Sequence, residues 1–221
     1  MSLPVPPLGR LQPQKRDAIV HAARRIFGRD GYARASIDAI AGAAGVSTRT
    51  LYKHFSTKEA LFAIVLEASA TEVADNFVER VRSAPIAATT AEVPAELIAV
   101  GHALVRMAID YPDHFAMVRQ INAESTHFPR PVLAAWHGAG PQRVEVAVGE
   151  RLSGLADRGL LVVPELGRAV LHFQSLTTVE ANPRGLHQAG HLTAAETDIA
   201  VAAGVHAFLH GYGSGPPGAM A

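Results

Sequence analysis

The sequence predicts an all-α protein, with a three-helix helix-turn-helix domain followed by a larger helical domain. Three observations lead to this fold class. Apolar residues recur at intervals of three and four along most of the chain, the pattern of helices with one buried face. No stretch shows the sustained apolar–polar alternation expected of a half-buried strand. Residues 36–55 have the spacing of two short helices joined by a tight turn.

The first predicted helix covers residues 14–30. It follows residues 1–13, which hold four prolines and no helical period and which we expect to be a disordered tail. Gly31 stands where a helix C-cap is expected. The apolar stripe of this helix consists of Ile19, Ala22, Ala23, Ile26 and Phe27.

Two short helices and a turn come next. Ser36 is placed to cap the first of them, because a serine hydroxyl can accept a free backbone N–H at a helix start. Gly45 tolerates the positive φ that a sharp turn needs. Ser47 can cap the second helix, whose clear inward-facing residues are Leu51 and Phe55.

The second of these helices carries hydrogen-bond donors at its other positions, which are Thr48, Arg49, Thr50, Tyr52, Lys53 and His54. A short helix with one anchored edge and a crowded donor face suits insertion into the major groove of DNA. The backbone amides after Ser36 could also hold a phosphate, because a helix N-terminus carries partial positive charge. The alternative is a small helical hairpin with a solvated polar face.

The distribution of charge agrees with a polyanionic partner. Residues 1–60 hold ten Lys/Arg and four Asp/Glu, whereas residues 61–221 hold ten Lys/Arg and sixteen Asp/Glu, although the net charge of the chain is zero. A basic first part on an acidic remainder favours a polyanion as the partner of the first part alone. Chance clustering is the alternative.

The pattern of the remaining chain predicts helices separated by prolines and glycines. Ser56 and Glu59 have the spacing of a capping box at the start of the first of these helices. Thr193 and Glu196 have the same spacing at the start of the last. We expect a helix-turn-helix domain over residues 14–60, a second domain over 61–212 and a disordered tail over 213–221. The predicted helices cover residues 56–81, 94–109, 115–121, 132–137, 144–155, 164–182 and 193–210.

The stretch from Gln14 to Leu66 resembles the DNA-binding domain of the TetR family of transcriptional regulators. The resemblance continues without gaps over roughly fifty residues, and the rest of the chain is similar to the family only in length and helical pattern. The features that carry it are the apolar helix above, Gly31-Tyr32, Ile40-Ala41, Gly45-Val46-Ser47, Leu51-Tyr52-Lys53-His54-Phe55 and Lys58-Glu59-Ala60-Leu61.

This resemblance implies roles for individual residues. The residues that match the family's phosphate contacts are Tyr52, His54 and Lys58, and those that match positions near base edges are Thr48, Arg49, Thr50 and Lys53. It also implies that the last two long helices form a four-helix dimer interface. The apolar stripes there consist of Leu166, Ala169, Val170, Phe173, Val201, Ala202, Val205, Phe208 and Leu209. The alternative is that both stripes pack inside one subunit.

A mostly apolar pocket for a small-molecule effector is expected in the second domain. Its polar anchors would be His102 and Arg119, and the alternative is that all these residues belong to an ordinary core. The expected apolar lining residues are Phe62, Leu66, Leu104, Phe115, Val118, Trp136 and Val144.

Several functions are not expected from this sequence. It has no cysteine, which excludes disulfides, thiolate metal sites and a cysteine nucleophile and fits a reducing cytoplasm. It has no G-x-S-x-G, G-x-x-x-x-G-K-[ST] or H-E-x-x-H motif, so we expect no enzyme activity and no cofactor. No apolar run reaches membrane-spanning length. His206 and His210 lie four residues apart on one predicted helix, and His187 and His191 have the same spacing in a loop, but we expect ordinary surface or interface histidines rather than a metal site.

The prediction is therefore a cytoplasmic homodimeric repressor that binds a palindromic operator in double-stranded DNA and is released by a small apolar or amphipathic effector. An activator of the same fold is one alternative. A helical ligand carrier or enzyme without specific DNA binding is the other.

Overall fold

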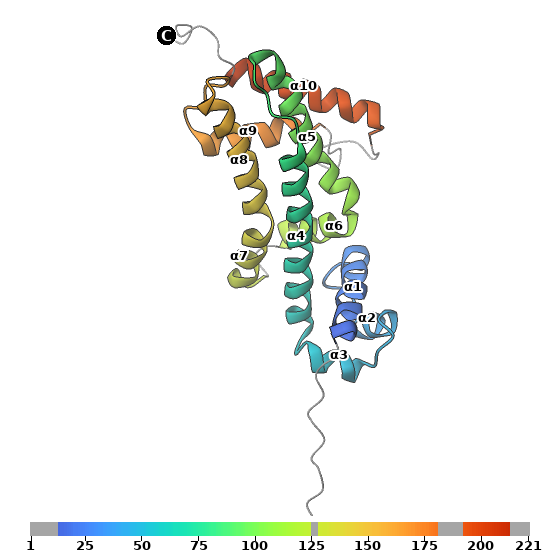
Figure 1. Ribbon diagram of the computed structural model, residues 1–221. Helices are drawn as coiled ribbons and strands as arrows, with labels where there is room; N and C mark the ends of the chain where they lie inside the picture. The colour runs from blue at the N-terminus through green and yellow to red at the C-terminus, as the bar shows by residue number, and fades with distance from the viewer. Residues whose placement is uncertain (1–12, 125–127, 181–191, 213–221) are drawn as a thin grey trace, which may run out of the picture. The chain divides into compact units, whose positions relative to one another are not determined.

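The structure is a computed structural model that describes residues 13–124, 128–180 and 192–212 (Figure 1). These residues form ten α-helices and one short 3-10 helix (η1) and contain no β-strand, so the all-α prediction is confirmed for the described part of the chain. Residues 1–12 and 213–221, which make up nearly all of the predicted tails, lie outside the described residues, as does the His187/His191 pair.

Most helix bounds lie within three residues of the predicted ones, because prolines and glycines mark most of the breaks, but the helix predicted over 164–182 ends at Thr178. The helices are α1 (Pro13–Asp30), α2 (Ile37–Ala43), α3 (Thr48–His54), α4 (Lys58–Ser83), η1 (Thr90–Glu92), α5 (Val93–Asp110), α6 (Pro112–Glu124), α7 (Arg130–Ala139), α8 (Pro141–Asp157), α9 (Leu166–Thr178) and α10 (Ala194–Tyr212).

The described residues fall into two compact units. Unit 1 runs up to Thr71 and resumes from Pro112 to His137, and unit 2 contains Glu72–Tyr111 and the described residues from Gly138 onward. Unit 1 therefore contains α6 and most of α7 in addition to α1, α2, α3 and the first part of α4, which continues into unit 2. The functional boundary that we expect at residues 60 and 61 stays a prediction.

The core of unit 1 joins the three N-terminal helices to the start of α4 and to α6. Ile19, Ile40 and Leu51 are completely buried, one from each of α1, α2 and α3. An aromatic cluster, formed by Phe27, Tyr32, Phe62 and Phe128, extends this core, with ring centroids 5.0–6.2 Å apart.

The end of α1 is held by the side chain of Gln120 in α6. Gln120 Oε1 accepts a hydrogen bond from the Tyr32 amide at 2.9 Å, and Gln120 Nε2 donates to the Phe27 carbonyl at 3.3 Å. Farther along the same contact, a Cβ added to Gly28 would lie 3.0 Å from the Asp113 Cα. The contact between α1 and α6 is therefore both close and specifically hydrogen-bonded.

Unit 2 is built from the second part of α4 and from α5, α8, α9 and α10, packed around buried aliphatic side chains and the Phe173–Phe208 pair. Glycines allow its helices to approach closely. A Cβ on Gly204 in α10 would lie 2.2 Å from the Leu176 carbonyl oxygen in α9. A Cβ on Gly101 in α5 would lie 2.7 Å from Val201 Cγ1.

A buried carboxylate in unit 2 was not anticipated from the sequence. Glu96, which is 1% exposed, accepts hydrogen bonds from the Ala87 amide at 2.6 Å and from Arg151 at 3.1 Å, and lies 3.5 Å from Arg158. Arg151 also donates to the Val81 carbonyl at the end of α4. This cluster holds the end of α4 against α5 and α8 within the unit.

Two local predictions were wrong. The cap of α4 is Thr57, whose hydroxyl accepts from the Ala60 amide at 3.1 Å, because α4 begins one residue later than the Ser56–Glu59 capping box requires. Ile109, placed on the apolar stripe of α5, is 51% exposed near the end of that helix. The Thr193–Glu196 capping box is confirmed by reciprocal bonds of 2.7 and 3.2 Å.

Candidate nucleic-acid interface

The two helices of the helix-turn-helix are set by their caps and one glycine. Ser36 Oγ accepts from the Ala39 amide at the start of α2, and Ser47 Oγ accepts from the Thr50 amide at the start of α3. Between them Gly45 has φ +66°, a left-handed conformation that costs glycine little. All three residues do what the sequence predicted.

One edge of α3 is fixed in the core of unit 1. Leu51 is fully buried and Phe55 is 2% exposed. The guanidinium of Arg16 in α1 lies 5.6 Å from the centre of the Phe55 ring, within the range of a cation–π contact. The helix is therefore anchored at its middle and at its C-terminal end.

The opposite edge of α3 faces solvent. Arg49, Tyr52 and Lys53 are all exposed, and their spacing of three and four residues puts them on one face of the helix. His54 is partly buried, and its ring centre lies 6.2 Å from that of Phe55. The exposed face thus presents two cations and a phenol, all able to donate hydrogen bonds.

The hydroxyl groups in the first turn of α3 already have partners in the protein. Thr48 Oγ1 donates to Asp38 Oδ1 of α2 at 2.9 Å, and Ser47 Oγ lies 2.9 Å from Thr50 Oγ1. Asp38 was not singled out from the sequence, because one carboxylate among basic residues gives no spacing signal. The bond from Thr48 to Asp38 ties the start of α3 to α2 and leaves Thr48 less free to donate to DNA.

Lys58, at the start of α4, also has partners within unit 1. Its Nζ donates to the Ala33 carbonyl at 3.2 Å and lies 4.9 Å from the centre of the Tyr32 ring. Glu59 beside it has a pKa below the usual value, because its own backbone amide and then the Tyr32 and Thr57 side chains donate to the carboxylate. Burial, reinforced by the bond to Glu59, raises the pKa of Tyr32.

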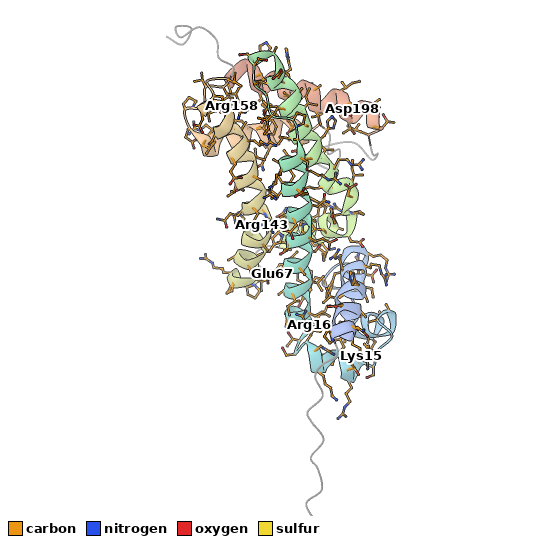
Figure 2. The ribbon with its side chains drawn as sticks, in the orientation of Figure 1. Lys15, Arg16, Glu67, Arg143, Arg158 and Asp198 are labelled. Carbon is orange, nitrogen blue, oxygen red and sulfur yellow. The ribbon has the colours of Figure 1, made fainter. Side chains whose placement is uncertain are left out.

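The structure adds two basic residues that the sequence analysis missed. Lys15 and Arg16, in the first turn of α1, lie at the end of unit 1 where α3 is found (Figure 2). Both are exposed. The excess of basic residues in the first sixty positions is evident from the sequence, but only the fold brings the start of α1 next to α3.

Comparison with known families decides the identity of this fold. The family model described as "Bacterial regulatory proteins, tetR family" matches residues 19–65. The model described as "AefR-like transcriptional repressor, C-terminal domain" matches residues 95–214, more than half of the chain. The chain belongs to the TetR family. It is a DNA-binding transcriptional regulator with a helix-turn-helix head.

Curated relatives match parts of this TetR-family chain. The HTH-type transcriptional activator FasR of Mycolicibacterium smegmatis is 33% identical over 122 residues, which cover 55% of this chain and 51% of FasR. The HTH-type transcriptional regulator UidR of Escherichia coli is 47% identical over 53 residues, which cover 24% of this chain and 27% of UidR. The matched regions thus span about half of FasR and about a quarter of UidR.

Solved TetR-family structures match nearly the whole chain. A putative regulator from Mesorhizobium loti has a TM-score of 0.79 at 27% identity, covering 93% of this chain and 99% of the other. The structure named Flavonoid-responsive Regulator FrrA has a TM-score of 0.66 at 27% identity, with the same coverage of both chains.

The nine residues predicted to line an effector pocket are divided between the two units of this TetR-family chain. Unit 1 holds Phe62, Leu66, Phe115, Val118, Arg119 and Trp136, and unit 2 holds His102, Leu104 and Val144. His102 Nε2 lies 3.4 Å from Asp198, and Arg119 is exposed, so neither predicted anchor lies free in an apolar interior. A hollow of about 540 Å³ between α8 and α9 is lined by none of the nine.

The residues predicted for the dimer interface also separate into two groups. Ala169, Phe173, Val201, Val205 and Phe208 lie in the core of unit 2, so the alternative that the stripes pack inside one subunit holds for them. Val170 is also buried, Leu209 is partly buried, and Leu166 and Ala202 are exposed.

A different set of apolar side chains on α9 and α10 faces solvent. Leu171 is 60% exposed, Val179 just after α9 is 61% exposed and Ile199 is 67% exposed. Most of the residues chosen from the sequence belong instead to the stripes that are buried within unit 2.

The described residues show neither a metal-binding cluster nor a membrane-spanning helix. They contain no group of three or more His, Asp or Glu side chains placed to hold a metal ion, and the His206 and His210 rings lie 4.2 Å apart as a pair. None of the described helices combines the length and apolar character needed to cross a bilayer.

Proposed function

We propose that this chain is a homodimeric, effector-responsive repressor whose α3 helices bind two half-sites of a palindromic operator. The exposed face formed by Arg49, Tyr52 and Lys53 carries the proposal. Its neighbours Leu51 and Phe55 fix the helix, so those three side chains can reach a groove without loosening the core. In the groove Arg49 and Lys53 would donate to guanine, and Tyr52 would donate to a phosphate.

A two-fold dimer would bring two such helices to one duplex. Half-sites about 34–36 Å apart, or a multiple of that spacing, are what two heads on one face of B-DNA require. The solvent-facing residues of α9 and α10 support the self-association, because Leu171, Leu176, Val179 and Ile199 are exposed apolar side chains in the described part of the chain.

The dimer surface can be tested with a pair of matched variants. Ile199→Glu places a charge on the proposed interface, and Ile86→Glu places one on an equally exposed isoleucine outside α9 and α10. We expect sedimentation equilibrium to show a monomer for Ile199→Glu and a dimer for Ile86→Glu. A dimer for both variants would mean that α10 does not form the interface.

Repression is favoured over activation by the AefR-like repressor model, which matches residues 95–214. Activation is the second candidate, because FasR is named an activator. A reporter gene placed downstream of the operator separates them. Deletion of the regulator raises expression if it is a repressor and lowers it if it is an activator.

The effector would be a small apolar or amphipathic molecule. Aromatic compounds of the flavonoid kind are the first class to test, because FrrA, which is similar over most of the chain, is named flavonoid-responsive. To release DNA, the effector must bind the DNA-incompetent conformation more tightly than the DNA-competent one. The hydrogen bonds that join Gln120 of α6 to the end of α1 offer a path between an effector and the head.

DNA recognition by α3 can be tested with two substitutions that should behave differently. Arg49→Ala should cost about 1–3 kcal/mol on the operator and much less on random DNA, if Arg49 reads a base. Lys58→Ala should weaken binding to all sequences alike and lower the salt slope by about 0.9 per lost phosphate contact. Equal losses for Arg49→Ala on operator and random DNA would remove its base-reading role. A ligand carrier or enzyme without specific DNA binding would show no operator preference in the wild type.

A further inference from the structure

Trp136 is the single tryptophan of the chain, and it has an unusual environment in α7. None of the described α7 residues is fully buried, and Leu133 and Trp136, three residues apart, are the side chains that pack on the core of unit 1. The Trp136 ring is partly exposed, but its Nε1 atom is buried and has no hydrogen-bond partner among the described residues. The indole N–H is therefore shielded from solvent, while another part of the ring stays accessible.

A buried N–H without an acceptor is unfavourable, because the group loses its hydrogen bond to water and gains none in return. Most buried polar groups in proteins avoid this loss. A bound molecule with an oxygen at this position would restore the missing bond. The residues chosen from the sequence as polar anchors do not offer such a donor, because His102 lies beside Asp198 and Arg119 is exposed.

We propose that the Trp136 indole N–H is the donor that anchors an aromatic effector through a neutral acceptor oxygen. This rests on the proposed effector response. An indole N–H can only donate, so it selects an acceptor rather than another donor. Because the donor is uncharged, a carbonyl oxygen satisfies it without a counter-charge. The core on which Trp136 packs contains Phe62 and Phe128, stacked 5.3 Å apart, so an aromatic body is chemically compatible with it.

Flavanone and flavan form a suitable pair of probes. They share the two aromatic rings and the saturated heterocycle, and only flavanone carries the ring carbonyl. Calorimetric titration of the wild-type protein should show flavanone binding about tenfold more tightly than flavan, the size expected of one buried hydrogen bond whose donor is otherwise unpaired.

Two variants assign that difference to Trp136. Trp136→Phe keeps an aromatic ring and removes the N–H, so it should lower the affinity for flavanone about tenfold and leave the affinity for flavan unchanged. Leu133→Ala removes packing on the same face of α7 without removing a donor, so it should weaken both probes by the same factor. Operator binding by each variant shows that it is folded.

A second measurement uses the wild-type protein alone. With one tryptophan, the ¹H–¹⁵N spectrum has a single indole resonance. Flavanone should shift its proton downfield, as a new hydrogen bond does, and flavan should not.

Equal affinities of the wild type for the two probes would overturn the proposal, and so would a flavanone preference that survives Trp136→Phe. Binding of neither probe would also overturn it. In each case operator binding by the same preparation reports separately on the proposed DNA-binding function.

Discussion

The contact between α9 and α10 at Gly204 predicts that two glycine-to-alanine substitutions in α10 change the melting temperature in opposite directions. A Cβ at position 204 would lie 2.2 Å from the Leu176 carbonyl oxygen and 2.7 Å from its carbonyl carbon. Ordinary contact begins near 3.4 Å, so the two helices must separate by about 1 Å. Because the obstacle is backbone, no side-chain rotation can relieve it.

The expected cost follows from that geometry. Overpacking of this kind costs about 3 kcal/mol at the upper end of its usual range. The better helix propensity of alanine returns about 1 kcal/mol. The net loss of about 2 kcal/mol corresponds to a fall of about 4–8 °C in the melting temperature of a chain of this size.

Gly211→Ala is the matched control, because Gly211 also lies in α10 and a Cβ there meets no atom within 4 Å. It should leave the melting temperature unchanged or raise it by up to about 4 °C. Both variants should be melted at the same protein concentration, since dimerisation would make the midpoint concentration-dependent. A Gly204→Ala variant that melts at or above the wild type would refute the close approach of α9 and α10.

Three further predictions concern unit 1. Thr48→Val, which removes the bond to Asp38, should reduce operator affinity about fivefold, and Thr48→Ser should retain it in the same fluorescence-anisotropy assay. The lowered pKa of Glu59 gives the folded protein a stabilisation that is present above about pH 4.3 and is lost as the pH falls through the folded-state pKa. Glu59→Gln should remove this stabilisation, so the melting temperatures of the variant and the wild type, measured from pH 3 to 6, should converge at the acid end. Gln120→Leu should leave operator affinity within about twofold but reduce effector-induced release of the operator. Release of the variant at the effector concentrations that release the wild type would mean that the Gln120 hydrogen bonds do not transmit the effector response.

The helix-turn-helix part of unit 1 could be predicted because its signals are local. Ser36, Ser47 and Gly45 act on backbone groups within a few residues, so their roles can be read from sequence spacing. Leu51 and Phe55 are the large apolar residues of a short helix, and only one side of it can face the core.

The surfaces of α9 and α10 could not be assigned in the same way. Each helix has apolar residues on more than one face, and periodicity shows which residues share a face but not what covers it. Phe173 and Phe208 are buried against each other within the chain, whereas Leu171 and Ile199 remain exposed.

Long-range polar contacts were also beyond the sequence. Asp38 and Thr48 are ten residues apart, and Arg16 reaches Phe55 across unit 1. The unpaired N–H of Trp136 is a property of packing alone, because tryptophan at a helical position gives no sign of what its nitrogen meets. Such contacts depend on how the helices are assembled, which local spacing does not encode.

Selection of bound fragments from a random-sequence DNA library by the full-length protein tests the central claim most directly. The account predicts enrichment of one palindrome whose half-sites lie about 34–36 Å apart, or a multiple of that spacing, and loss of preference at specific base pairs when Arg49 is replaced by alanine. Fragments that remain random in sequence after repeated rounds, for a protein that is folded and binds DNA, would contradict the claim that the exposed face of α3 reads bases.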